Sequence, residues 1–244
     1  MKNSIVCVIP ARGGSKRVPR KNIKNFLGKP LLAWTIEAAK KSEVLPRIIL
    51  STEDDEIANV GKKYGAEVPF MRPKKLAQDK TPALPVVEHA IDWLKRNENM
   101  EVDWIIFLEP SSPGRQPFHI REVADLINKA KNIDSIVGVS EIPPHFSPLK
   151  ALKMDKSNLI SRYTDGELIK NLTHRNQDIS STYFINSSIY AFKVSNFLKS
   201  DSPSLWGNRV LGYKMDSIYA LDIDTPEDWA VAEMKMKHLH SYAV

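Results

Sequence analysis

Short apolar runs alternate with stretches of helical periodicity over the first 140 residues of the chain. Residues 4–9 (SIVCVI) have the length and composition of a buried strand, whereas residues 31–41 repeat apolar positions with the spacing of an amphipathic helix. The two patterns then follow one another in turn. They predict strands at 4–9, 47–51, 67–70, 103–108 and 135–140, and helices at 31–41, 54–64, 82–96 and 117–130.

This alternation is typical of βαβ units that build a parallel sheet with helices on both faces. We therefore expect an α/β protein with a Rossmann-like, doubly wound and mostly parallel sheet, and one domain covering residues 1–244. In this architecture ligands bind beyond the carboxyl ends of the strands, so chemistry is sought in the segments that follow them.

The alternation stops between residues 141 and 181, where a proline-rich stretch is followed by a polar one with an Asp165-Gly166 pair typical of a hairpin turn. We interpret 141–181 as an inserted arm. Strands are predicted again at 183–192 and 216–222. A terminal helix is expected after Thr225, with Thr225 as N-cap and Asp228 as its capping-box partner.

Composition is that of an ordinary globular protein, with 42% hydrophobic and 26% charged residues. The sequence has no apolar run near the roughly 18 residues that span a bilayer, and its start lacks a secretory signal pattern. We therefore expect a cytoplasmic protein with no membrane partner. The single cysteine, Cys7, lies in an apolar run and is predicted to be a buried, reduced thiol.

The net charge of +6 has one source. Seven of the 35 lysines and arginines lie in residues 9–30, which contain no acidic residue. The rest of the chain has 28 basic and 29 acidic residues, so its charges nearly cancel. A nucleic-acid surface usually spreads its cations among aromatic residues, whereas a concentrated basic loop after a strand suits a compact polyanion such as a nucleoside triphosphate. We expect no nucleic-acid partner, although a noncatalytic nucleic-acid-binding protein stays open as an alternative.

Within this loop, two adjacent glycines allow close approach of the backbone to a ligand, and Arg12, Lys16 and Lys21 can reach separate phosphate oxygens. The spacing fits neither a Walker A loop nor the G-x-G-x-x-G fingerprint. The competing interpretation is a solvated, disordered basic loop. The high density of positive charge in this loop, with no acidic residue among it, favours the triphosphate site over the disordered loop.

Two more groups of polar residues follow predicted strands. Asp222 and Asp224 project the same way if the chain there is extended, and paired carboxylates suit Mg²⁺ held together with substrate phosphates. An aspartate before a helix is also a common turn or capping residue. Glu109, two serines and Arg115 follow strand 103–108, where an ordinary strand-to-helix turn is the alternative.

With these motifs in place, the chain resembles the acylneuraminate cytidylyltransferase family, which includes synthetases of CMP-sialic, CMP-legionaminic and CMP-pseudaminic acids. The opening IPARGGSKRVPRKNIKNFLGKPLLAW is similar to the family's signature almost throughout. Further similarities, in the family's order, are STEDDEIANVGKKYGAEVPFMRP, LEPSSPGR, PPHFSPLK, NSSIY and DIDTPEDW. The resemblance implies a nucleotidyltransferase, GT-A-like version of the fold, in which the arm serves dimerisation.

The implied reaction joins CTP to a nine-carbon 2-keto acid sugar, giving CMP-sugar and pyrophosphate with Mg²⁺ as cofactor, in a homodimer. By resemblance, Arg12, Lys16 and Lys21 are catalytic and Asp222 and Asp224 hold the metal. The implied nucleotide site comprises Ala11, Arg12, Gly13, Gly14, Ser15, Lys16, Asn22, Arg72 and Ala83. The implied sugar site comprises Glu109, Ser111, Lys150, Arg175, Gln177 and Asn186.

The departures from the family lie on the sugar side. Glu109 replaces a glutamine, the NSSIY segment replaces N-G-A-I-Y, and one arginine beside Arg175 is missing. An acid facing an anionic sugar repels it unless the acid is protonated, metal-linked or accepting a hydrogen bond. We hypothesise that Glu109 selects a sugar other than N-acetylneuraminate. A cytidylyltransferase for 3-deoxy-octulosonate and a GT-A-like glycosyltransferase are the remaining alternatives.

Overall fold

A six-stranded sheet with the strand order β10-β6-β9-β5-β1-β4 forms the centre of the molecule. The computed structural model describes residues 3–129, 131–171, 180–198 and 203–241. All neighbouring strands are parallel except β9, which runs antiparallel to both β5 and β6. The strands are β1 (Ile5–Pro10), β4 (Ile48–Ser51), β5 (Trp104–Phe107), β6 (Ser135–Glu141), β9 (Tyr183–Lys193) and β10 (Val210–Lys214).

Alternate side chains of the central strands form two separate cores, as expected for a sheet covered on both faces. One face packs on α1, α2 and α4, and the other packs on α3 and the short α5. The predicted doubly wound α/β fold is confirmed. These helices span α1 (Leu31–Lys41), α2 (Asp55–Tyr64), α3 (Ala83–Glu98), α4 (Pro117–Lys129) and α5 (Ser195–Leu198), and the last helix is α6 (Pro226–Ser241).

Capping residues set the boundaries of α2 and α6, and at α6 they are the predicted Thr225 and Asp228. The Asp54 side chain accepts from Ile57 N at 3.0 Å, and Gly65 ends α2 in the left-handed conformation at φ 95°. At α6, Thr225 N donates to the Asp228 carboxylate at 2.8 Å and Asp228 N donates to Thr225 Oγ1 at 3.2 Å. Both helix starts therefore form through local side-chain bonds that the sequence encodes.

Two predicted strands are wrong. Residues 67–70 contribute only one bridge, between Glu67 and Ile49. Residues 216–222 are not a strand: the Asp216 carboxylate accepts from Ile218 N at 2.9 Å and turns the chain away from the sheet, whose edge strand is the earlier β10. The predicted turn at Asp165-Gly166 exists, with Gly166 at φ 78°, but it follows the hairpin of β7 (Leu152–Met154) and β8 (Ile160–Arg162) instead of joining it.

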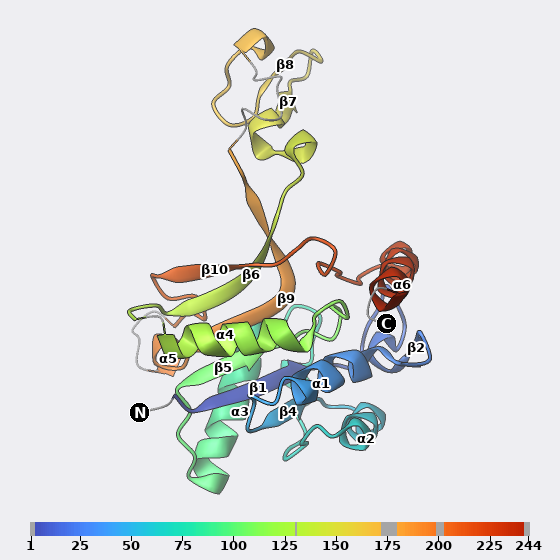
Figure 1. Cartoon of the computed structure of the whole chain (residues 1–244), viewed down its shortest axis with the longest axis vertical. Coiled ribbons are helices and arrows are strands. Elements are labelled where there is room, and N and C mark those ends of the chain that lie inside the picture. Colours follow the sequence, from blue (N-terminus) through green and yellow to red (C-terminus); the bar gives the residue numbers. More distant parts are fainter. Residues whose placement is uncertain (1–2, 130, 172–179, 199–202, 242–244) are drawn as a thin grey trace.

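The basic loop, residues 11–30, is ordered by its own apolar anchors. It contains the 3-10 turn η1 (Lys21–Ile23) and the short strands β2 (Asn25–Phe26) and β3 (Lys29–Pro30). Phe26 is fully buried and meets the Trp229 ring of α6 edge-on, with ring centroids 5.2 Å apart. Figure 1 shows α6 lying beside this loop. The interpretation of a disordered basic loop is therefore wrong.

The arm projects far from the sheet on a stalk formed by β6 and β9 (Figure 1). Its described part holds the β7–β8 hairpin and three short 3-10 turns, η3 (Pro144–Phe146), η4 (Pro148–Lys150) and η5 (Ile169–Asn171). Large apolar side chains stand open on it, including Phe146 at 73% exposure and Leu159 at 71%. Among the described residues, no helix has both the length and the apolar character needed to cross a bilayer.

Candidate active site

A cleft of about 640 Å³ opens beyond the carboxyl ends of β1 and β5, where the fold class predicts a ligand. It brings together segments from residue 10 to residue 224 of the chain. Of the residues predicted from the sequence, the cleft is lined by Arg12, Ser15, Lys16, Lys21, Asn22, Arg72, Ala83, Glu109, Ser111, Asp222 and Asp224.

The start of the basic loop is fixed by backbone and side-chain bonds. Ala11 is buried and its N–H donates to Ser51 O at 3.0 Å, while Asn22 Nδ2 donates to Arg12 O at 2.9 Å. At Gly13 a Cβ atom would lie 2.5 Å from the Asp54 carboxylate, whereas a Cβ at Gly14 would meet nothing within 4 Å. Gly13 is therefore required by internal packing, and Gly14 leaves open space.

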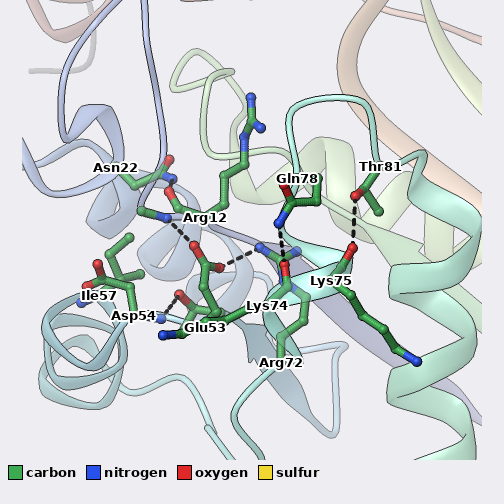
Figure 2. A network of polar contacts seen from close by, with 12 residues as sticks. Arg12, Asn22, Glu53, Asp54, Ile57, Arg72, Lys74, Lys75, Gln78 and Thr81 are labelled. Carbon is green, nitrogen blue, oxygen red and sulfur yellow. Dashed lines mark hydrogen bonds and ion pairs between the residues drawn. The ribbon is translucent and has the colours of Figure 1, made fainter.

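Glu53 connects this loop to Arg72, and sequence reasoning missed it. Its carboxylate accepts from Gly13 N at 2.8 Å and from Arg72 Nη2 at 3.0 Å, and Arg72 is only 5% exposed. Figure 2 shows Glu53 between Arg72 and the loop that carries Arg12 and Asn22. The available signal was an acid two residues after β4, at the same sheet edge as the loop.

Asp79 is a second acid in the cleft that the sequence did not single out. It pairs with Arg12 at 2.6 Å and also with Lys16, two of the cations predicted to bind phosphate. Its bond from Lys16, followed by that from Arg12, holds the pKa of Asp79 below its usual range. Arg12 and Lys16 already bind carboxylate oxygens within the cleft, so the same side chains can bind the oxygens of a phosphate.

Asp222 and Asp224 reach the cleft from an extended segment that belongs to no sheet. Leu221 and Ile223 alternate with them and are buried, and Ile223 N donates to Ser111 O at 2.9 Å. Both carboxylates consequently face the same side although the predicted strand is absent. Lys21 Nζ lies 3.1 Å from the Asp224 carboxylate and 2.5 Å from Ile223 O.

The two aspartates differ in environment. Burial raises the pKa of Asp222, while hydrogen bonds from Ser111 and Ser187 favour its charged form. Asp224 is exposed and pairs with Lys21 and, at 3.6 Å, with Arg17. The described residues contain no cluster of three or more potential metal ligands. This donor set fits a hard cation that completes its shell with phosphate oxygens and water, as Mg²⁺ does.

Glu109 follows β5 and stands between this cleft and a second, apolar hollow of about 340 Å³. Burial, and then the negative charge of Asp222, raise the pKa of Glu109 to about 7. The wall of the apolar hollow is formed by Pro82, Ala83, Leu84, Phe107, Tyr190, Phe192, Leu205 and Trp206. The region therefore offers a large polar compartment and a smaller apolar one that share a carboxyl group.

Comparison with known proteins fixes the family. The sequence pattern of the family described as Cytidylyltransferase matches residues 6–200. The chain belongs to the cytidylyltransferase family. A CMP-N,N'-diacetyllegionaminic acid synthase of Legionella pneumophila is 35% identical, with 96% of each chain covered. A pseudaminic acid cytidylyltransferase of Campylobacter jejuni is 31% identical over the full length of both chains.

Other relatives share only part of their length or only the fold. An N-acylneuraminate cytidylyltransferase of Escherichia coli is 30% identical over 95% of this chain and 52% of that protein. A CMP:2-keto-3-deoxy-manno-octonic acid synthetase solved with CTP is similar in fold at a TM-score of 0.68 and 16% identity, covering 96% of this chain and 99% of that one. The fold prediction thus agrees with solved cytidylyltransferases.

Two of the remaining predicted sugar residues, Lys150 and Asn186, do not line the cleft. Asn186 is buried in β9, where its Nδ2 donates to Ser140 Oγ at 3.0 Å and its Oδ1 accepts from Ser188 N at 3.1 Å. Lys150 lies on the arm. Arg175 and Gln177 fall outside the described residues. These assignments stay predictions.

Arg115 has a supporting position. It is 2% exposed, donates to Glu109 O at 2.9 Å and Thr35 Oγ1 at 3.2 Å, and also bonds Ser188 O. It therefore joins the backbone of Glu109 to the backbone of β9 behind the cleft. Such a buried network of hydrogen bonds keeps the Glu109 side of the cleft in one conformation.

Proposed function

We propose that this cytidylyltransferase joins CTP to a nonulosonic, sialic-acid-like 2-keto acid sugar and releases pyrophosphate. The observation that carries the proposal is the cleft in which Arg12, Lys16 and Lys21 face Asp222 and Asp224. Full-length similarity to proteins named as synthases of CMP-legionaminic acid and cytidylyltransferases of pseudaminic acid supports the substrate class.

In this reaction the anomeric hydroxyl of the sugar attacks the α-phosphorus of CTP. A new P–O bond forms, the hydroxyl loses its proton, and the bond to the departing pyrophosphate breaks in line. Arg12, Lys16 and Lys21 offset the charge that develops on the leaving group, and before the substrate binds they are paired with Asp79 and Asp224.

The nucleotide is held by the other residues of the basic loop and by the segment before α3. Ser15 and the backbone at Gly13 and Gly14 approach the phosphates, while Asn22, Arg72 and the backbone near Ala11 and Ala83 bind ribose and cytosine. Asp222 and Asp224 would hold Mg²⁺, which supplies positive charge to the phosphate oxygens when bound. Because these groups have fixed positions, binding also orients the α-phosphorus of CTP for attack by the anomeric hydroxyl of the sugar.

The sugar is placed on the Glu109 side, with Ser111 and the apolar hollow. A carboxyl group whose pKa is about 7 is largely uncharged below neutral pH, which removes its repulsion of the sugar carboxylate. We keep the hypothesis that Glu109 selects a sugar other than N-acetylneuraminate. An unchanged substrate profile of Glu109→Gln over several nonulosonic acids would count against it.

The arm is proposed to form a homodimer, with residues 141–181 as an insertion in a single domain and with Lys150 and Arg175 near the sugar carboxylate in the partner's active site. Gln177 stays a predicted sugar-binding residue. Exposed apolar side chains on the arm support this assignment, since a second copy would bury them. A cytoplasmic location also stays a prediction.

Pyrophosphate release from CTP and Mg²⁺ with a panel of nonulosonic acids and 3-deoxy-octulosonate tests the proposal. We expect turnover with a nonulosonic acid, and its loss in both Asp222→Ala and Lys21→Ala variants that still fold. Normal turnover in both variants would remove the role assignments. No turnover with any sugar, together with salt-dependent oligonucleotide binding, would instead favour a nucleic-acid-binding protein.

A further inference from the structure

Glu53 lies where the segment after β4 meets both the basic loop and Arg72. One oxygen of its carboxylate accepts from Gly13 N at 2.8 Å, and the other accepts from Arg72 Nη2 at 3.0 Å (Figure 2). The side chain of Glu53 is 15% exposed and that of Arg72 is 4% exposed, so solvent and salt screen this ion pair only weakly. A single carboxylate thus bonds two groups from separate segments of the chain.

The residues on both sides of Glu53 are also fixed to these segments. Arg72 N donates to Thr52 O at 2.7 Å, so Arg72 is bonded to the segment through its backbone as well as its side chain. Asp54 caps α2 and pairs at 2.5 Å with Arg20, which belongs to the basic loop. Glu53 is therefore held in place from both sides, and its carboxylate has a defined position.

The guanidinium of Arg72 has donors that the chain itself does not use. A guanidinium carries five N–H donors. Among the described residues, Glu53 accepts the only hydrogen bond that this guanidinium makes, and the buried Nε has no partner. Arg72 also lines the cleft. A buried guanidinium with a fixed orientation and unused donors suits the acceptor atoms of a nucleoside.

We propose that Glu53 is a positioning residue that couples binding of the nucleoside part of CTP to binding of its triphosphate. It bonds Arg72 on the nucleoside side and Gly13 in the loop that faces the phosphates. Because both groups share one carboxylate, the two half-sites keep a fixed position relative to each other, as a ligand containing both halves requires. The inference rests on the proposed function, since it takes CTP as the ligand and Arg72 as a contact of its nucleoside.

Glu53→Gln tests this inference with little change in shape. A carboxylate accepts from both donors, whereas an amide has one accepting oxygen and an NH₂ group that would face the second donor. Glu56→Gln is the matched control, because Glu56 is exposed, pairs with Arg20 and lies outside the lining of the cleft. Its affinities for nucleotide and phosphate ligands should equal those of the wild type.

Calorimetric titration with CTP, and separately with inorganic triphosphate at the same Mg²⁺ concentration, distinguishes the two half-sites. We expect Glu53→Gln to weaken binding of inorganic triphosphate by about threefold, because the loop loosens, and binding of CTP by about 30-fold, because Arg72 is also misplaced. Arg72→Ala should weaken binding of CTP by about tenfold and leave binding of inorganic triphosphate unchanged. A general loss of structure would instead weaken both ligands equally.

The double variant of Glu53→Gln and Arg72→Ala tests whether the two residues act together. It should bind CTP about as weakly as Glu53→Gln alone, because both substitutions remove the same nucleoside contact. Additive losses would overturn the inference. If circular dichroism shows that Glu53→Gln does not fold, Glu53→Asp replaces it, since a side chain shorter by about 1.5 Å withdraws both oxygens from their donors.

The remaining outcomes separate this inference from the proposed function. Equal weakening of CTP and inorganic triphosphate in Glu53→Gln would overturn the coupling, as would wild-type affinity for either ligand. Turnover by the wild type would leave the proposed function intact in these cases. Wild-type binding of CTP without turnover on any sugar would refute the proposed function, whereas the expected pattern of affinities would still support the coupling by Glu53.

Discussion

Two segments of this cytidylyltransferase leave the central sheet, and they differ in how their side chains are accommodated. The basic loop 11–30 carries dense positive charge yet buries Val18 and Phe26 against α6. The described part of the arm contains only a short hairpin and 3-10 turns. It leaves Phe146 and Leu159 more than two-thirds exposed. The charged segment is thus anchored within the chain, and the apolar one is not.

This difference separates two ways of building a site. The loop and the acids around it are placed by contacts of one chain, which fits the early binding of a flexible, highly charged triphosphate. The arm has apolar surface without a covering layer among the described residues, which fits placement by a second copy. Four predictions test this contrast, from the largest expected effect to the smallest.

Phe26→Ala should lower the free energy of unfolding by about 3–5 kcal/mol, because a fully buried ring against Trp229 is replaced by a cavity. Denaturant unfolding measures this, and CTP affinity should fall with it as the loop loosens. Phe146→Ala makes the same chemical change on the arm, where the ring is 73% exposed, and should leave the stability of the monomer unchanged. Equal losses in the two variants would contradict the contrast.

Glu109→Gln should change how stability depends on pH. The folded-state pKa of Glu109 is about 7, above its unfolded value near 4.5, so the folded protein holds the extra proton between these pH values. The stabilisation is complete below about pH 4.5 and is lost as pH rises to 7, by about 3 kcal/mol.

Unfolding in metal-free buffer from pH 4.5 to pH 8 measures this effect. In Glu109→Gln the fall in stability across this range should shrink by that amount. An identical pH profile would show that the carboxyl titrates normally. The measurement also compares two parts of the cleft. The cations of the basic loop are neutralised by ion pairs with Asp79 and Asp224, whereas the Glu109 carboxylate is neutralised by taking up a proton.

Paired substitution of Met154→Asp and Leu159→Asp on the arm should weaken dimerisation by at least about 30-fold, since each places a charge where a second copy would bury apolar surface. Light scattering over a concentration series gives the association state, and circular dichroism verifies that the body stays folded. A wild type that is monomeric at high concentration, or a variant that associates equally well, would contradict the dimer proposal.

Asp79→Asn should tighten CTP binding by about threefold at low salt, because the internal carboxylate no longer competes with phosphate for Arg12 and Lys16. Calorimetric titration at two ionic strengths measures this, and the gain should diminish at the higher one. Asp125→Asn removes an exposed acid on α4 and controls for the change in net charge. Weaker binding in Asp79→Asn would mean that Asp79 holds the cations in place for CTP.

Local chemistry made much of the fold predictable. Helix α1 spans the predicted residues, Asp54 and Gly65 bound α2, and Thr225 with Asp228 begins α6, because each feature depends on neighbours in sequence. The predicted strand at 216–222 was wrong because a turn at Asp216 and the nearby edge strand β10 decide where pairing ends. The aspartate pair still faces the cleft, since alternation with Leu221 and Ile223 needs only extended backbone.

The sequence predicted those candidate site residues whose chemistry is recognisable and which directly follow a strand. Cations after β1, Glu109 after β5 and two alternating aspartates all carried a local signal. Asp79 did not, because its partner Arg12 lies 67 residues away and its importance arises from tertiary contact. Glu53 carried only its position after β4, since its partners Gly13 and Arg72 are also distant in sequence.

The bond from Lys21 to the backbone of Ile223 joins positions 202 residues apart. On the ribosome the basic loop emerges before its apolar anchors on α6 and before the second wall of the cleft, which follow roughly 200 residues later. Such long-range closure is a late event in folding. A nascent chain therefore displays the cations long before it can hold the nucleotide, because the cleft closes only after the segment around Ile223 has been synthesised.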